Sequence, residues 1–103
     1  MERLIINVQI NWISENQGGK NNLPINTLYY VNTEPIKSKI GETTYWSLVL
    51  DIKSNSYDEE GNERIGLGKA YFLADDAPDF LLTQGFTLNV YEGPKFVAVV
   101  EVL

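Results

Sequence analysis

Hydrophobic and polar side chains alternate with a period of two along four segments of the chain: residues 4–12, 44–52, 86–91 and 96–102. Strict alternation of this kind predicts a β-strand that buries one face and exposes the other. In the first segment the apolar face runs from Leu4 to Trp12, and amide side chains occupy the opposite face. In the last segment Phe96 and Ala98 share a face, and the opposite face is also rich in valine.

Two further segments predict strands from their composition. Residues 25–32 are rich in Thr, Tyr and Val, which favour extended backbone. Residues 65–74 place large apolar side chains on one face and only Gly66, Gly68 and Ala70 on the other. Glycines inside a strand often mark a bulge or a sharp bend at the corner of a barrel. We therefore expect a distortion of the sheet at these glycines.

Turn-forming residues separate the six segments. A glycine-containing loop follows the first strand, residues 58–62 form a charged hairpin loop, and residues 92–95 form a tight turn. Of the whole chain, only residues 78–83 favour a helix, and they suffice for a single turn. We expect Asp76 to cap that turn and Gly85 to end it.

Six short strands joined by turns are typical of an antiparallel sandwich or a closed barrel. A closed barrel is favoured because the strands are strongly apolar and closure removes exposed edges. We therefore predict an all-β protein, a six-stranded antiparallel Greek-key β-barrel with one short helical turn near residues 78–83. A length of 103 residues is sufficient for one hydrophobic core, so residues 1–103 are expected to form one domain.

The residue types present exclude several kinds of chemistry. The chain contains neither Cys nor His, which rules out thiol nucleophiles, disulfides, Cys/His zinc sites and histidine general bases. With 14 acids in 103 residues, carboxylate pairs arise by chance and do not indicate a glycosidase. Residues 66–69 (Gly-Leu-Gly-Lys) lack the spacing of a phosphate-binding loop. We therefore expect no enzymatic activity and no cofactor.

The charge distribution limits the class of partner. The formal net charge is −6; residues 1–53 hold five acids and five bases, whereas residues 54–103 hold nine acids and three bases. This charge repels nucleic acid and anionic membranes and favours a basic protein partner. No apolar run approaches the roughly 18 residues of a membrane-spanning helix, and the alternating start is unlike a secretory signal. We expect a cytoplasmic protein that is a monomer or a weak homo-oligomer.

Two groups of acidic residues, the first beside an aromatic residue, are the candidate partner-binding surface. They comprise Tyr57, Asp58, Glu59, Glu60, Glu63, Asp75, Asp76 and Asp79. Gly61 is in the fourth place from Asp58, which does not match a calcium-binding loop. Three interpretations of the first group stay open: a solvated hairpin tip, contact with a basic partner, and a weak divalent-cation site. Tyr45 and Trp46 fall on opposite faces of one strand, so we expect one of them to be exposed.

Three segments carry a family pattern: residues 6–24 with Gly-Gly-Lys at 18–20, residues 72–82, and residues 85–98 with a Glu-Gly-Pro-Lys turn. In this order they resemble the C-terminal β-barrel domain of elongation factor Tu and small free-standing bacterial proteins built on that barrel. Lys20 replaces the family's arginine, and residues 29–32 lack its Tyr-Arg-Pro-Gln segment. The resemblance implies the barrel fold; these departures and the acidic charge argue against transferring tRNA contact or docking on a GTPase domain.

Together these observations predict a non-catalytic protein-binding module of the bacterial cytoplasm. One concrete form is an immunity protein that neutralises a basic toxin through the acidic surface. The alternative, which the resemblance implies, is a translation-associated accessory protein that binds a translation factor or a ribosome component.

Overall fold

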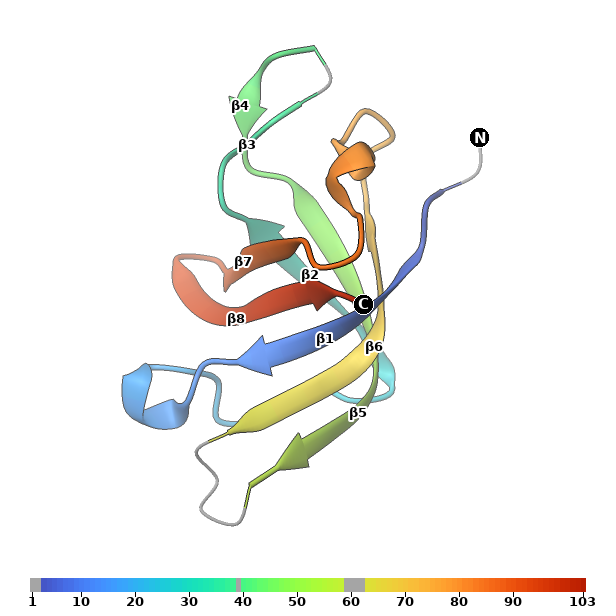
Figure 1. Ribbon diagram of the computed structural model, residues 1–103. Coiled ribbons are helices and arrows are strands. Elements are labelled where there is room, and N and C mark those ends of the chain that lie inside the picture. The colour runs from blue at the N-terminus through green and yellow to red at the C-terminus, as the bar shows by residue number, and fades with distance from the viewer. Residues whose placement is uncertain (1–2, 39, 59–62) are drawn as a thin grey trace.

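The computed structural model describes residues 3–38, 40–58 and 63–103. Within these ranges lie eight β-strands and two 3₁₀ turns (Figure 1). The strands are β1 (Ile6–Trp12), β2 (Thr27–Thr33), β3 (Ile36–Lys37), β4 (Thr43–Thr44), β5 (Ser47–Tyr57), β6 (Arg64–Phe72), β7 (Thr87–Glu92) and β8 (Lys95–Val102). The turns are η1 (Glu15–Gln17) and η2 (Asp79–Leu81).

Six strands close into an antiparallel barrel in the order β1-β6-β5-β2-β7-β8, and β8 pairs with β1 to complete it. β2, β5 and β6 follow one another in the sheet, and β1, which precedes them in the chain, pairs with β6 rather than with β2. This is a Greek-key arrangement. The predicted all-β, six-stranded antiparallel barrel is therefore confirmed. Each barrel strand overlaps one of the six segments that alternation or composition predicted.

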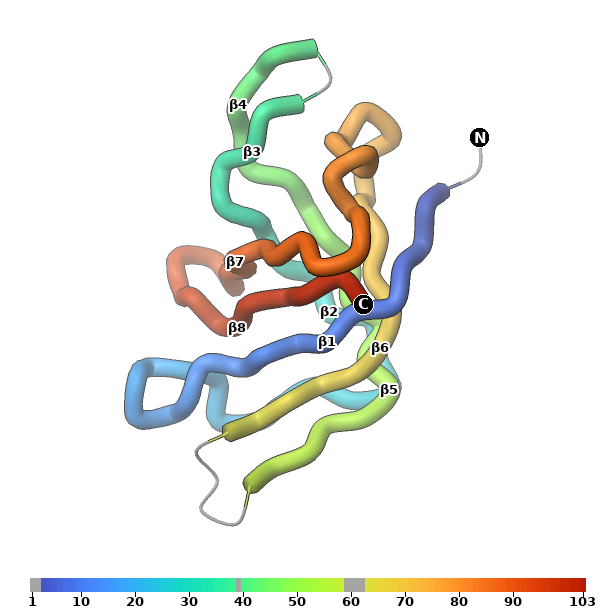
Figure 2. Tube along the Cα trace, in the orientation of Figure 1, coloured from blue at the N-terminus to red at the C-terminus, as the bar shows by residue number. Residues whose placement is uncertain are grey.

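A small two-stranded sheet, β3 with β4, was not predicted from the sequence. Pro35 ends β2, and Ile36 then pairs with Thr44 before the chain enters β5. The sheet projects from one end of the barrel (Figure 2). Two-residue strands are too short for an alternating pattern, so only the fold reveals them.

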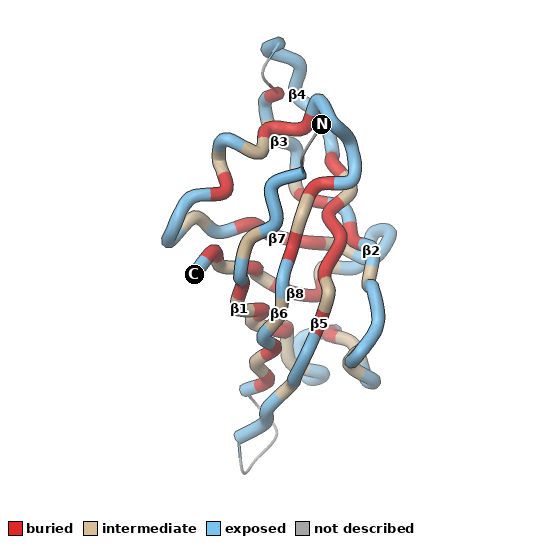
Figure 3. The backbone as a smooth tube through the Cα atoms, turned by 90° about the vertical axis from the view of Figure 1, so that its right-hand side faces the viewer, coloured by how far each residue is buried: buried red, intermediate tan, exposed pale blue. Residues whose placement is uncertain are grey.

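The alternating apolar positions form one core inside the barrel. Leu48 and Leu50 of β5 are fully buried and pack with Ile10 of β1. Buried segments concentrate along the middle of the strands, and exposed segments lie mainly in the loops (Figure 3). Leu4 is an exception to the predicted inward face, because β1 pairs with β6 only from Ile6 onward.

The glycines of β6 lie where β5 bulges. The pairing of the two strands shifts between Ile52 and Ser54, which stand opposite Gly68 and Leu67. A Cβ atom at Gly68 would lie 2.1 Å from the main-chain oxygen of Asp51. The backbones therefore approach too closely for any side chain, which confirms the predicted distortion at the glycines.

A second bulge lies between β7 and β8 and was not predicted. Val90 pairs with Ala98 and Tyr91 with Phe96, so Val97 is an extra residue on β8. Val97 and Ala98 both enter the core, whereas the ring of Phe96 packs against Tyr91 at a centroid distance of 5.4 Å. The predicted shared face of Phe96 and Ala98 is therefore wrong, because one extra residue reverses the alternation.

The helical segment predicted near residues 78–83 contains one 3₁₀ turn, η2. Pro78 occupies the N-cap position and no side chain caps the turn, so the expectation that Asp76 caps it is wrong. The Asp79 N–H donates instead to the main-chain oxygen of Ala77 (2.8 Å). Gly85 follows the turn with a φ of 89°, a left-handed conformation that suits glycine.

Candidate functional site

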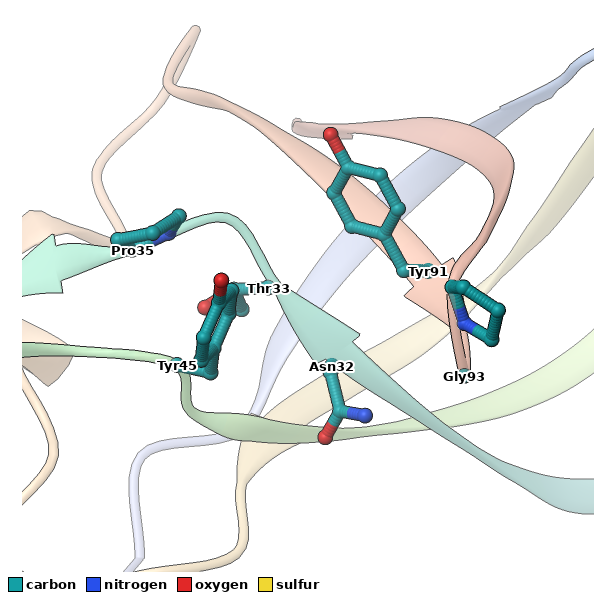
Figure 4. Close-up of a pocket in the computed structure, with 7 residues that line it drawn as sticks. Asn32, Thr33, Pro35, Tyr45, Tyr91 and Gly93 are labelled. Carbon is teal, nitrogen blue, oxygen red and sulfur yellow. The ribbon is translucent and has the colours of Figure 1, made fainter.

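An open groove of about 620 Å³ lies on the outside of the barrel, where the end of β2 meets the β7–β8 turn and the segment entering β5. The lining residues are Asn32, Thr33, Pro35, Tyr45, Tyr91, Gly93 and Pro94. Figure 4 shows Tyr45 and Tyr91 on separate segments to either side of β2, with Asn32 between them. Residues far apart in the sequence thus form one surface.

Hydrogen bonds to Thr33 and Trp46 position one wall of the groove. The buried Thr33 hydroxyl donates to the main-chain oxygen of Glu34 (2.7 Å) and accepts a hydrogen bond from the main-chain N–H of Trp46 (3.2 Å). The Trp46 indole enters the core and donates to the Ile36 oxygen (3.2 Å). Because Trp46 points inward, the preceding Tyr45 points outward and is 66% exposed. The prediction that one of these two aromatic residues is exposed is confirmed.

The β7–β8 turn and its bulge position the opposite wall. Gly93 has a φ of 58°, which allows the strands to connect through Gly93 and Pro94 alone. The bulge turns Phe96 out of the core and under Tyr91, so the Tyr91 ring is supported from one side. Tyr91 also stands directly opposite Asn32 in the sheet.

The lining side chains offer aromatic and proline surfaces together with hydrogen-bonding groups. They provide two phenols, a carboxamide and two prolines, and none of the seven carries a carboxylate or an amine. The nearby Glu34 carboxylate accepts a hydrogen bond from the main-chain N–H of Asn89 (3.0 Å). This bond connects Glu34 to β7. Tyrosine and proline surfaces with amide hydrogen-bonding groups suit the contact of a protein segment.

Three side chains, Lys20, Tyr29 and Glu92, form a rim clasp next to the β7–β8 turn. Lys20 Nζ lies 2.7 Å from Glu92 Oε1, and the Tyr29 hydroxyl donates to the same oxygen (2.5 Å). Lys20 Nζ is also 5.3 Å from the centre of the Tyr29 ring. The hydrogen bonds from Lys20 and then Tyr29 lower the pKa of Glu92. Burial, followed by the Glu92 contact, raises the pKa of Tyr29.

Raising the pH should destabilise the wild-type protein more than a Tyr29→Phe variant. The folded protein keeps Tyr29 protonated above its ordinary pKa of about 10, whereas the unfolded chain ionises there. The contribution of Tyr29 is thus complete below about pH 10 and declines as the pH rises further. Urea unfolding of both proteins across this range measures it, and parallel pH dependences would contradict the assignment.

The two acidic groups lie at opposite ends of β6. Tyr57, Asp58 and Glu63 flank the hairpin before the strand, whereas Asp75, Asp76 and Asp79 follow its end. At about 3.3 Å per residue, the length of β6 separates the groups by about 26 Å. Glu59 and Glu60 lie outside the described residues. The structure therefore does not gather the predicted contact residues into one compact surface.

Within the first group, Tyr57 is 60% exposed at the end of β5. The main-chain N–H of Asp58 donates to the main-chain oxygen of Glu63 (3.0 Å), which supports the predicted hairpin. In the second group Asp75 forms an exposed ion pair with Arg3 at 3.5 Å. The residues described include no cluster of three or more acidic side chains placed to hold a metal ion. The cation interpretation therefore depends on residues that the structure does not describe.

The groove residues are the functional candidates that sequence reasoning missed. The sequence predicts that either Tyr45 or Trp46 is exposed, but no local pattern connects Tyr45 with Tyr91 or Asn32. Residues 66–69 lie inside β6, so their assignment to a strand rather than a phosphate-binding loop is confirmed.

Among the described residues, no helix has the length and apolar character that a membrane crossing requires. The resemblance to the C-terminal barrel of elongation factor Tu stays a prediction, with the barrel itself established. No protein-family model, curated protein or solved structure matches the chain.

Proposed function

We propose that this protein is a non-catalytic protein-binding module and that the groove between Tyr45 and Tyr91 is its principal contact surface. The observation that supports the groove is the 66% exposure of Tyr45 on the wall that Thr33 and Trp46 position. Exposed aromatic side chains on a rigid support lose little conformational entropy on binding and often dominate interface energies.

The partner is a basic protein, and a toxin neutralised by this chain is the concrete form of the proposal. The net charge of −6 supports this choice, because complementary charge accelerates association and excludes acidic partners. Acidic groups at both ends of β6 extend the negative surface along the molecule. In this arrangement the groove supplies most of the affinity and the acidic groups mainly raise the association rate.

Affinity capture from a lysate of the host, with mass spectrometry of the retained proteins, identifies the partner. A stoichiometric basic protein that is lost at high salt is the expected result. Retention of ribosomal proteins or translation factors would instead favour a translation-associated role. Retention of neither class would contradict the proposal.

Replacing Tyr45 with Ala should weaken binding of that partner about thirtyfold, the effect of losing about 2 kcal/mol at an interface centre. Tyr57→Ala is the matched control, since Tyr57 is similarly exposed (60% against 66%) but lies at the acidic hairpin. Isothermal titration calorimetry measures both. A larger loss for Tyr57→Ala would transfer the principal contact from the groove to the hairpin.

The contribution of the acidic hairpin is separable by kinetics. Replacing Asp58 and Glu63 with Lys should lower the association rate constant and reduce its dependence on salt, with a smaller change in dissociation. Surface plasmon resonance at several salt concentrations distinguishes the two rates. An unchanged association rate would remove this hairpin from the proposed mechanism.

A further inference from the structure

β2 has an unpaired edge along most of its length. On one side it pairs with β5 from Thr27 to Asn32, but on the other side it meets β7 only through Asn32 and Thr33. β7 ends at Glu92, so in the described part of the chain no strand pairs with residues 27–31 on that side. Edges of this kind can accept an additional strand.

The main-chain groups of Leu28 and Tyr30 face this edge. The Glu34 N–H donates to the main-chain oxygen of Asn89 in β7 (3.1 Å). The Thr33 N–H instead donates to the main-chain oxygen of Trp46, which immediately precedes β5 (2.9 Å). Main-chain groups point alternately to the two sides of a strand. The even-numbered residues of β2 therefore face the β7 side, where only the end of the strand is paired.

The side chains that β2 itself contributes to this edge are uncharged, and the Lys20–Glu92 ion pair of the rim clasp lies against Tyr29. Leu28 is 46% exposed, Tyr30 is 55% exposed, and Ile25, just before the strand, is 50% exposed. Figure 3 shows exposed residues near the β2 label. β2 contains no charged residue, although sheet edges are commonly protected by Lys, Pro or a bulge. The exposed, uncharged side chains of Leu28 and Tyr30 are complementary to an equally uncharged strand.

We propose that this edge pairs with β2 of a second copy of the chain, antiparallel about a two-fold axis at Tyr29. Leu28 of each copy then stands opposite Tyr30 of the other, and their edge-facing N–H and C=O groups are all paired. Aliphatic–aromatic pairs across strands add to the stability of a sheet. Shifting the register would require Asn26, whose φ of 54° is not extended, or Asn32, which already pairs with β7.

A second copy meets the requirements of this surface better than a basic partner does. A two-fold interface must be complementary to itself, and exchanging Leu28 and Tyr30 across the axis satisfies that condition. One acidic group comes before β6 in the chain and the other comes after it, so neither lies on β2. The inference is independent of the proposed function, which uses the groove and the acidic groups.

Sedimentation equilibrium of the full chain should show a monomer–dimer equilibrium. Leu28→Lys should raise the dimer dissociation constant by about tenfold or more, because an edge lysine opposes strand addition. Leu67→Lys is the matched control: Leu67 is 45% exposed, but β6 is paired on both sides. A monomeric wild-type protein, or equal effects of both substitutions, would overturn the proposal.

A charge-swap variant tests the register itself. In Leu28→Lys/Tyr30→Glu, each Lys faces a Glu of the other copy, so dimerisation should recover relative to Leu28→Lys alone. Thermal unfolding at low protein concentration establishes that each variant is folded before its mass is interpreted. If the folded double variant remains as dissociated as the single variant, the two-fold axis is not at Tyr29 and the proposed pairing is wrong.

Discussion

Replacing Gly68 with Ala should destabilise the protein by about 3 kcal/mol, at the upper end of the cost of overpacking a core. An added Cβ would lie 2.1 Å from the Asp51 oxygen and 3.0 Å from the Ile52 Cα. Both atoms belong to the backbone of β5, so neither can move without disturbing the pairing of β5 with β6. Urea unfolding monitored by tryptophan fluorescence measures the change.

Gly66→Ala is the matched control for this prediction. A Cβ at Gly66 would lie 2.8 Å from Asn55 Oδ1 and 3.0 Å from Trp12 Nε1. These are ends of side chains, which can move, although their hydrogen bond of 2.9 Å would be disturbed. We therefore expect a smaller loss than for Gly68→Ala. Equal losses at the two positions would show that the backbone contact is not decisive.

Replacing Arg64 with Met should cost about 3 kcal/mol, because two partly buried main-chain carbonyl groups would lose a charged donor. The Arg64 side chain is only 3% exposed, and its guanidinium group donates to the main-chain oxygens of Lys20 (2.6 Å) and Ile13. Glu15, 3.6 Å away, is 57% exposed and compensates weakly. Arg64 therefore fixes the loop that carries Lys20 to the rim clasp. The free energy of unfolding, measured with urea, tests this.

Lys69→Met is the control for Arg64→Met, since Lys69 is an exposed cation on the same strand. Its replacement should change stability by no more than about 0.5 kcal/mol. Arg64→Lys separates charge from geometry, because a single ammonium group cannot reproduce the two directed bonds of the guanidinium. Full stability of Arg64→Lys would contradict the structural role assigned to the guanidinium fork.

The strands and the core could be predicted because their signal is local. Each alternating segment became a barrel strand, and residues such as Ile10 and Leu50 entered the core as expected. The glycines of β6 also carried their own signal, since a strand position without a side chain indicates a close approach of backbone. The partner of that approach, Asp51 of β5, had no signal in the sequence.

Errors arose where a bulge or the start of a turn departed from the regular local pattern. The extra Val97 reversed the direction of Phe96, and a proline rather than Asp76 began the 3₁₀ turn. The acidic residues are close together in the sequence, which predicted one contact surface. Because an extended strand separates its ends by its full length, β6 instead places the two acidic groups far apart.

By itself, the sequence determined the class of the fold, the inward face of most strands and the range of excluded chemistry. These properties depend on residue types and on an alternation with a period of two. Both can be read within one short segment, without knowing which strands meet. The tertiary structure alone decided the groove and the open edge of β2. Both require knowledge of which strands meet: Asn32, Tyr45 and Tyr91 become neighbours only when the barrel closes. Likewise, the main-chain groups of Leu28 and Tyr30 that face away from β5 lack a strand partner in the described part of the chain, because β7 ends before it reaches them.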